Sequence, residues 1–446
     1  MKSKLFCLSL VAVLALAFTA CGGTATPAAP AAPPADAAAP EPAPEAAVPE
    51  TGAAEAAFED PEPGVGGTIE LWSMFTGADG DTFDGILDRF NATNPDFTLI
   101  YRPMEAGDLY LRLALAVASG EGIPDIAMNH VERIPMFAMQ GAVTDLSPFY
   151  ANAGISPSDF NAKAWSMTEI GGGHFGIPLD VHSWILWANM DIIDELGLNV
   201  LSDGTLTWDD FFSIAPAVVD AGYIPFGLSW DWPSFMSSFP QLGGVLSEDG
   251  RYPIFNNDIA YRVVNHYRSM VEMGFTQQEG VSAWDEFFAG NILFFPYGVW
   301  ALNAVNASES NIQPFNFPVF DRANIGHWTS AHFFTVPTDP NREDERVYAA
   351  LEAIQFVVEN SIDWAMAGLV LTHVEASRDP VFQTLPQAWL ADQNEELLIS
   401  DYLFYGFAMD AISRVLTDMF WGHLDISEGL SRAQQEIRDS IEMGGY

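Results

Sequence analysis

The N-terminal 21 residues constrain this chain most, because they fix the compartment in which the rest of it folds. Lys2 and Lys4 form a short positive segment. Residues 5–18 are an apolar run that is too short to span a bilayer comfortably, and small residues precede Cys21. The pattern predicts an export signal over residues 1–20 and a mature chain outside the cytoplasm.

The end of this signal is similar to the bacterial lipobox, although Phe18 stands where Leu is usual. The resemblance implies cleavage after Ala20, attachment of lipid at Cys21 and anchorage to the cell membrane. An ordinary secretory signal with a chance cysteine is the alternative. Because Cys7 leaves with the signal, we expect the exported protein to fold without a disulfide.

Residues 21–67 are dominated by Ala, Pro, Gly and Glu, with Phe58 as the single aromatic residue. So little apolar area cannot offset the entropy of the chain, and we expect a disordered tether. The remaining residues, from 68 to 446, have the length for two lobes.

The formal net charge of −43 comes from 17 basic against 60 acidic residues. Lys163 is the only lysine that remains after signal cleavage. A nucleic-acid partner is excluded on these grounds, because phosphate neutralisation needs clustered Lys and Arg.

Strand and helix patterns alternate at the start of the body. Residues 68–72, 98–101 and 125–128 read as strands, and residues 81–91 and 108–119 as helices, the second closed by Gly120. This order predicts an α/β fold with a mainly parallel sheet and ligand loops at the carboxyl ends of the strands.

Seven motifs then follow in a fixed order: Ile69-Glu70-Leu71-Trp72; Ala118-Ser119-Gly120 with Pro124-Asp125-Ile126; Gly141-Ala142-Val143-Thr144-Asp145-Leu146; His174-Phe175-Gly176-Ile177-Pro178-Leu179; Trp187-Ala188-Asn189-Met190-Asp191; Thr207-Trp208-Asp209-Asp210-Phe211; and residues 288–300. In this order the chain resembles the carbohydrate-type extracytoplasmic solute-binding proteins of ABC importers. It departs from their Leu-Pro-x-Arg motif at residues 371–376, which read Leu-Thr-His-Val-Glu-Ala.

The resemblance implies a two-lobed periplasmic-binding-protein-like α/β fold of type II, with a ligand cleft between the lobes and a hinge of three crossovers near 178–182, 327–332 and 374–380. One lobe would comprise residues 68–179 and 328–378, and the other residues 180–327 and 379–446. It further implies a monomer that binds a carbohydrate, meets permease subunits, needs no cofactor and is not an enzyme.

Sugars pack their C–H faces on aromatic rings, while their hydroxyls pair with carboxylates, amides and imidazoles. Aromatic and polar residues near strand ends or crossovers are therefore the candidate ligand contacts: Trp72, Asp79, Asn129, His130, Glu132, Asp180, His182, Trp187, Trp230, Asp231, Trp300 and Trp328. Trp208 and Asp125 are expected to have structural roles, in the core and as a buried acceptor.

Two further patterns are weighed and set aside. His182, His327, His332 and His373 lie near the crossovers, but their spacing fixes no pair on one helix face, so we predict no metal site. Residues 171–176 match Gly-x-Gly-x-x-Gly but lead into Ile177-Pro178-Leu179, which predicts a hairpin-like turn rather than a dinucleotide site.

Two alternative functions stay open. A glycerol phosphodiester could replace the sugar, with Arg102, Arg112 or Arg133 as its cation, although bases are scarce. A secreted glycoside hydrolase would need two carboxylates in the cleft with separated pKa values.

Overall fold

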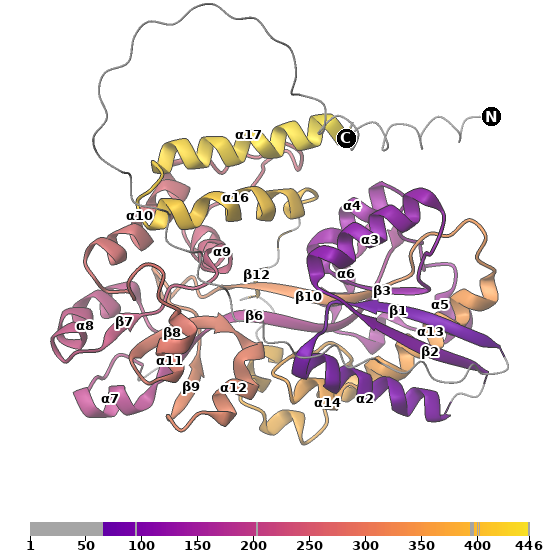
Figure 1. The fold of residues 1–446 in the computed structure, drawn as a ribbon, viewed down its shortest axis with the longest axis horizontal. Coiled ribbons are helices and arrows are strands. Elements are labelled where there is room, and N and C mark those ends of the chain that lie inside the picture. The colour runs from indigo at the N-terminus through magenta and orange to yellow at the C-terminus, as the bar shows by residue number, and fades with distance from the viewer. Residues whose placement is uncertain are drawn as a thin grey trace, which may run out of the picture. The chain divides into compact units, whose positions relative to one another are not determined.

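A ten-stranded mixed sheet runs through the body of the protein (Figure 1). The computed structural model describes residues 66–93, 96–201, 204–392, 397–398, 400 and 402–444. The strand order of the sheet is β2-β1-β3-β10-β6-β8-β7, with β9 and β11 paired to β6 and β12 paired to β10. The strands of this sheet are β1 (Gly67–Ser73), β2 (Phe97–Pro103), β3 (Ile126–His130), β6 (Ile177–Asn189), β7 (Ile224–Phe226), β8 (Ile292–Gly298), β9 (Ile312–Phe315), β10 (His327–Thr335), β11 (Val370–Leu371) and β12 (Leu397–Leu398).

The predicted signal, its Cys21 and nearly all of the predicted tether lie outside the described residues. Among the residues that are described, no helix has the length and apolar character needed to cross a membrane.

The helices flank this sheet along the chain. They are α2 (Gly77–Thr93), α3 (Ala106–Ser119), α4 (Ile134–Met139), α5 (Tyr150–Ala153), α6 (Ala162–Ser166), α7 (Met190–Leu196), α8 (Trp208–Asp220), α9 (Asp231–Gln241), α10 (Asp258–Glu272), α11 (Ala283–Phe288), α12 (Leu302–Ala307), α13 (Asp344–Glu359), α14 (Ile362–Ala365), α15 (Val374–Ser377), α16 (Tyr405–Phe420) and α17 (Ile426–Gly444). In Figure 1, α2 and α3 lie on opposite sides of β1 and β2, as expected for an α/β layer.

The predicted opening of the body is confirmed. β1 pairs in parallel with β2 and β3, and α3 ends at Gly120, whose positive φ of 73° forms the left-handed cap. The start of α2 was predicted wrongly, because the helix begins at Gly77 and not at residue 81.

The prediction of a mainly parallel sheet is wrong at its centre. β10 runs antiparallel to β3 and β6, and β6 runs antiparallel to β8. Parallel strands need a crossover connection between them, which is usually a helix. The segment directly before β6 is instead a short hairpin of β4 (Glu169–Ile170) and β5 (Gly173–His174). That hairpin confirms the turn predicted for residues 171–176, with positive φ at Gly171 and Gly172.

Two clusters of buried side chains form the core. One gathers around β1–β3, α2 and α13, and the other around α8, α9, α10, α16 and α17. Phe382 and Leu390 belong to the first cluster, and Tyr402 belongs to the second. Every residue of β6 is buried, and this strand contributes Ile185 to the first cluster and Trp184 to the second.

Trp208, the first residue of α8, lies in the core as predicted. Thr207 caps α8 by accepting the N–H of Asp210 at 3.0 Å, and Trp208 is 2% exposed. Asp125 is likewise a buried acceptor, which receives the N–H of Glu70 at 3.0 Å and the guanidinium of Arg346.

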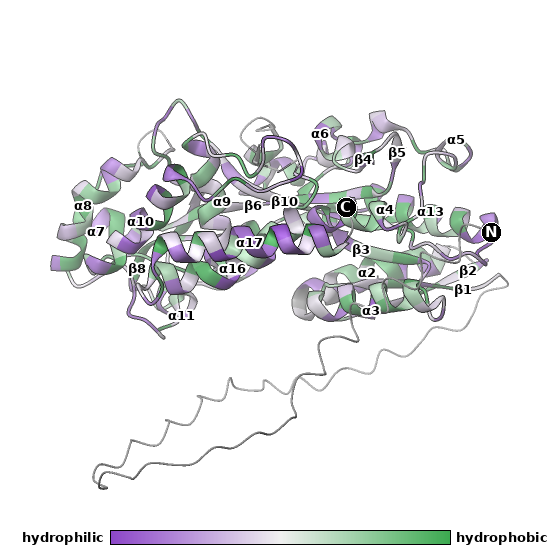
Figure 2. Cartoon of the chain, turned by 90° about the horizontal axis from the view of Figure 1, so that it is seen from above, coloured by the Kyte–Doolittle hydropathy of each residue, from purple (hydrophilic) through white to green (hydrophobic). Residues whose placement is uncertain are grey.

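α16 and α17 lie side by side in Figures 1 and 2 and pack on α10. Figure 2 shows hydrophilic and hydrophobic segments alternating along α17. The buried positions of this helix recur about every three or four residues: Ile426, Gly429, Leu430, Ala433, Ile437 and Ile441. The last helix of the chain is therefore part of the second cluster.

His327, at the start of β10, is an ionisable side chain in the core. Its side chain is fully buried, and neither ring nitrogen has a hydrogen-bond partner among the described residues. Burial, with a smaller effect from Lys163, lowers the pKa of His327 to about 3. The folded protein thus holds this imidazole neutral where the unfolded chain would protonate it.

We therefore expect His327 to weaken the fold as the pH falls. In the unfolded chain, His327 takes up a proton below its ordinary pKa of about 6.5, whereas in the folded protein it stays neutral down to about pH 3. The free energy of unfolding therefore decreases as the pH falls from about 6.5 to about 3. In His327→Phe, the loss of unfolding free energy between pH 6.5 and 4.5 should be smaller by about 2 kcal/mol. Urea titrations at both pH values measure it, and equal losses in the two proteins would contradict the assignment.

Candidate functional site

A row of polar side chains crosses the three central strands of the sheet. In register, His332 of β10 lies opposite His130 of β3 on one side and opposite Asp180 of β6 on the other. Residues directly opposite in antiparallel strands share a face, as do residues two apart in one strand, which adds His182. The pairing of the strands thus gathers residues that are up to about 200 positions apart in the sequence.

Asp180 is the centre of this row. Its carboxylate is fully buried and accepts the Nδ1–H of His182 at 3.1 Å, the Nδ1–H of His332 at 2.9 Å and the Nε1–H of Trp364 at 2.6 Å. A carboxylate can only accept, so both histidines must present Nδ1 as the donor. Three donors from β6, β10 and α14 satisfy a charge that would otherwise be costly to bury.

The pKa values in this row follow from its burial. Burial alone would raise the pKa of Asp180, but the charge and hydrogen bonds of His332 and His182 outweigh it and hold that pKa below its usual range. Burial, then the neighbouring His332, lowers the pKa of His182 to about 4. The pKa of His130 is lowered well below its ordinary value by burial and by both other histidines. At neutral pH the row therefore contains a carboxylate beside neutral His130 and His182.

Tryptophan rings lie against this row. The Trp300 ring centroid is 5.5 Å from that of His182 and 5.9 Å from that of Trp230, and the Trp328 centroid is 5.8 Å from that of Trp230. Trp328 is 2% exposed and donates Nε1–H to Tyr405 Oη at 2.9 Å, whereas Trp230 is 51% exposed. We call Trp230, Trp300 and Trp328 the indole group. It offers an aromatic surface beside hydrogen-bonding side chains.

Trp230 has an unfavourable backbone conformation. Its φ of 40° makes it the one non-glycine residue with positive φ in the described part of the chain, directly before the first residue of α9. Such a conformation costs on the order of 1 to 3 kcal/mol and is concentrated at functional sites. A bulky, half-exposed ring that is held at this cost is a strong candidate for ligand contact.

Gly298 makes room for Trp300. A Cβ atom at Gly298 would lie 2.1 Å from the Trp300 ring, although the φ of Gly298, −69°, suits any residue. Glycine at position 298 therefore has a steric cause, because the Trp300 indole lies across the α-carbon of Gly298 at the end of β8.

Two predicted carboxylates lie near the row. Glu132 is buried and accepts the hydroxyl of Ser330 at 2.7 Å, and burial raises its pKa. Asp79, in the first turn of α2, has its pKa raised by burial while it interacts electrostatically with His332 and Asp180. Both could pair with the hydroxyls of a ligand.

Other predicted residues are not brought to this row. Asn129 is buried, and strand alternation turns it to the opposite face from His130, where its amide donates to Thr335 Oγ1 at 2.8 Å. Asp231 accepts the hydroxyl of Thr417 at 2.6 Å. The described side-chain hydrogen bonds of these two residues are with Ala127, Thr335 and Thr417, and their contact with a ligand stays a prediction.

Trp72 and Trp187 have structural contacts as well. The Trp72 indole donates to Glu70 Oε1 of its own strand at 2.5 Å. Trp187 is 2% exposed in the core and donates to the carbonyl of Gly298 at 3.3 Å. Within the described part of the chain, neither indole makes a ring contact with the row or with the indole group.

Four residues in or beside the row were not among the predicted ligand contacts. His332 was considered only as a metal ligand, and Tyr110, Phe75 and Trp364 were not considered. Phe75 lies edge-on to His332 with ring centroids 4.7 Å apart, and Tyr110 Oη lies 2.5 Å from His130 Nδ1. Phe75 follows β1, in the loop where ligand contacts were expected, so strand-end position was the one signal available for it.

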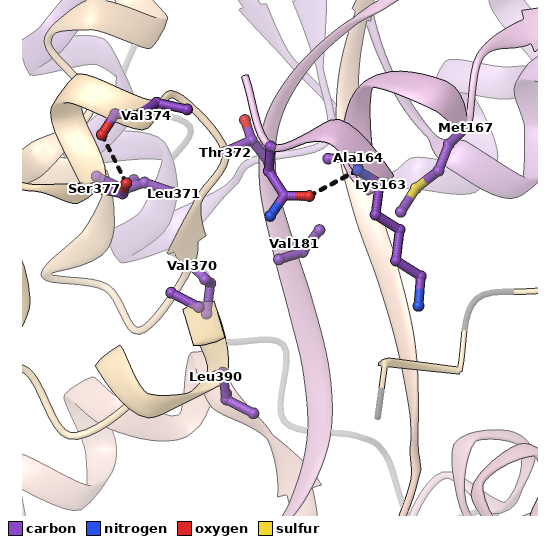
Figure 3. A pocket seen from close by; sticks show the side chains of 12 residues that line it. Lys163, Ala164, Met167, Val181, Val370, Leu371, Thr372, Val374, Ser377 and Leu390 are labelled. Carbon is purple, nitrogen blue, oxygen red and sulfur yellow. Dashed lines mark hydrogen bonds between the residues drawn. The ribbon is translucent and has the colours of Figure 1, made fainter. Parts of the chain in front are cut away.

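A separate pocket of about 90 Å³ lies on the other face of β6 (Figure 3). Val181, Val370 and Leu371 line it, with Lys163 at its edge. Because side chains alternate along a strand, Val181 points away from the face of Asp180 and His182. This largely apolar pocket is therefore distinct from the polar row.

Residues 76–361 match the family model of the bacterial extracellular solute-binding protein, and the chain belongs to this family. Membership implies a location outside the cytoplasm. An arabinooligosaccharide-binding protein of Halalkalibacterium halodurans is 29% identical over 157 residues, which cover 35% of this chain and 34% of that protein. The chain thus matches about a third of the length of this curated relative.

Solved structures have the same fold. The GacH receptor of Streptomyces glaucescens, solved unliganded and with acarbose, has a TM-score of 0.73 at 16% identity, covering 84% of this chain and 98% of that one. UgpB from Mycobacterium tuberculosis, in complex with glycerophosphocholine, has a TM-score of 0.74 at 19% identity, covering 85% and 100%. The predicted periplasmic-binding-protein-like α/β fold is confirmed.

Gly298→Ala tests how Trp300 is held. The added methyl group must displace the indole, and overpacking of this kind costs about 1 to 3 kcal/mol. We expect a lower melting temperature and an altered near-ultraviolet circular dichroism spectrum. Gly85→Ala in α2, where a Cβ atom meets open space, is the control and should leave that spectrum unchanged. Equal behaviour of the two variants would refute the steric role of Gly298.

Proposed function

We propose that the protein is the substrate-binding lipoprotein of an ABC importer, which captures a mono- or oligosaccharide and delivers it to a membrane permease. The observation that carries this proposal is the half-exposed Trp230 with positive φ, beside Trp300 and the polar row of Asp180 and His182. An indole face and fixed polar groups are the two surfaces that a sugar ring needs. The arabinooligosaccharide-binding relative supports arabinooligosaccharides as the first ligands to test.

The same proposal includes two lobes near the expected bounds, residues 68–179 with 328–378 and residues 180–327 with 379–446. β6 and β10 would be two of the three crossings, since both strands contribute to both core clusters. The packing of Phe382 and Leu390 in the first cluster supports a third crossing beyond Leu390 rather than near 374–380. A monomer anchored by lipid at Cys21 completes the proposal.

A glycerol phosphodiester is less well supported as the ligand. Arg133 is the basic residue closest to the row in the sequence, and both terminal nitrogens of its guanidinium bind Asp410, at 2.7 and 2.9 Å. A bidentate pair of this kind leaves little of the cation for a phosphate.

We propose that the protein has no catalytic step. A glycosidase needs one carboxylate free to attack or to activate water. Asp180 instead accepts three hydrogen bonds from His182, His332 and Trp364, which suits a fixed orienting group. The site would bind a solute and release it unchanged.

Trp230→Ala tests the sugar assignment. Loss of a stacked ring forfeits on the order of 1 to 3 kcal/mol, so the dissociation constant should rise by roughly tenfold to a hundredfold. Calorimetry with arabinooligosaccharides and maltooligosaccharides measures it, and the wild-type protein should also show a change in tryptophan fluorescence.

Trp208→Ala is the matched control, because it removes an indole of the same size from the core. It should lower the melting temperature and leave the affinity nearly unchanged. If both variants bind like the wild-type protein, the indole group is not the sugar platform. If no member of a broad sugar panel gives heat while a peptide does, the carbohydrate assignment is wrong.

A further inference from the structure

Three imidazole rings converge at the polar row. One nitrogen from each of His130, His182 and His332 lies within 4.8 Å of the others. The ring centroids are 4.3 Å apart for His182 and His332, 4.9 Å for His130 and His332, and 5.7 Å for His130 and His182. They come from three adjacent strands, so the backbone of the sheet fixes their spacing.

The Nδ1 atom of each ring is already engaged. Asp180 accepts Nδ1–H of His182 and of His332, and Tyr110 Oη lies 2.5 Å from Nδ1 of His130, where it can accept that proton. None of the hydrogen bonds among the described residues uses Nε2 of these three rings. A carboxylate or oxygen on Nδ1, with Nε2 left as a lone pair, is the arrangement found around histidines that bind metal.

The geometry points to a ligand that the solute-binding role does not require: we propose that Nε2 of His130, His182 and His332 together bind one Zn²⁺ ion. Three nitrogens at 2.0–2.1 Å from a tetrahedral zinc lie about 3.4 Å apart, and one ring nitrogen from each of the three histidines lies within 4.8 Å of the others. Imidazole suits zinc, copper, iron and nickel, and three neutral ligands with one open position are a common zinc arrangement.

The charges around the three histidines favour a cation. Asp180 is buried directly behind two of the rings, and Asp79 interacts electrostatically with His332. The cation closest in sequence, Arg133, is neutralised by Asp410. The fourth coordination position would be left to water or to an oxygen of a bound solute, and Trp300 lies edge-on to His182 beside it.

Zinc binding is tested on the full chain without a histidine tag, after dialysis against EDTA and with no sugar present. Calorimetric titration with zinc chloride should give one site per chain. His130→Phe keeps the ring volume and leaves the bonds of Asp180 intact, and it should weaken that site by more than about a hundredfold, beyond the 10–100-fold typical of outer-shell partners. Asp180→Asn, a positioning residue, should weaken it by about 10–100-fold.

His423→Gln is the matched control, because His423 is an exposed histidine paired with Glu279 at 2.6 Å. It should bind zinc like the wild-type protein. Cobalt substitution gives a readout that is independent of stability: the wild-type protein should show the intense visible absorption of tetrahedral Co²⁺, and folded His130→Phe should not. The proposal is overturned if zinc gives no stoichiometric binding, or if stoichiometric binding of undiminished affinity survives His130→Phe. Sugar binding by the EDTA-treated protein is scored separately, so the two proposals can fail independently.

Discussion

The buried carboxylate of Asp180 is the interaction on which the rest of the site depends. An ionised carboxylate in a protein interior is tolerated only when its oxygens are paired, and removal of one partner of a buried pair typically costs about 3 to 5 kcal/mol. Asp180 is paired three times, with His182 on its own strand, His332 on β10 and Trp364 on α14. These bonds join two long central strands to a helix and orient both imidazoles.

Around this fixed centre, the aromatic and polar parts of the site have different physical tasks. The indole of Trp328 is anchored by Tyr405, and Trp300 lies across Gly298, so neither ring is free to turn. Trp230 alone is half exposed, and its backbone bears strain. Preorganised groups lose little entropy on binding, which is the property a capture protein needs when its solute is dilute.

Much of the fold could be predicted from the sequence, because the periodicity of apolar residues and the positions of glycines indicate β1, α3 and the hairpin at 171–176. The central antiparallel pairing could not, since it depends on contacts between β6 and β10 that are about 150 residues apart. The same limit explains the site. Strand-end position found His130 and Asp180, but only the register reveals that His332 lies between them and that Asn129 faces the other way. Trp187 illustrates the converse, since residue type and position did not show that its indole lies in the core.

We propose that the solute binds on the face of β6 and β10 that carries Asp180 and His332. Hydrogen–deuterium exchange, with and without a sugar that binds in calorimetry, can locate the bound solute. Bound sugar should slow exchange in the segments that carry the row and the indole group, at residues 128–133, 180–183, 228–232, 298–302 and 328–333. Protection confined to residues 161–167 and 370–377, which surround the apolar pocket on the other face of β6, would show that the solute does not bind at the row.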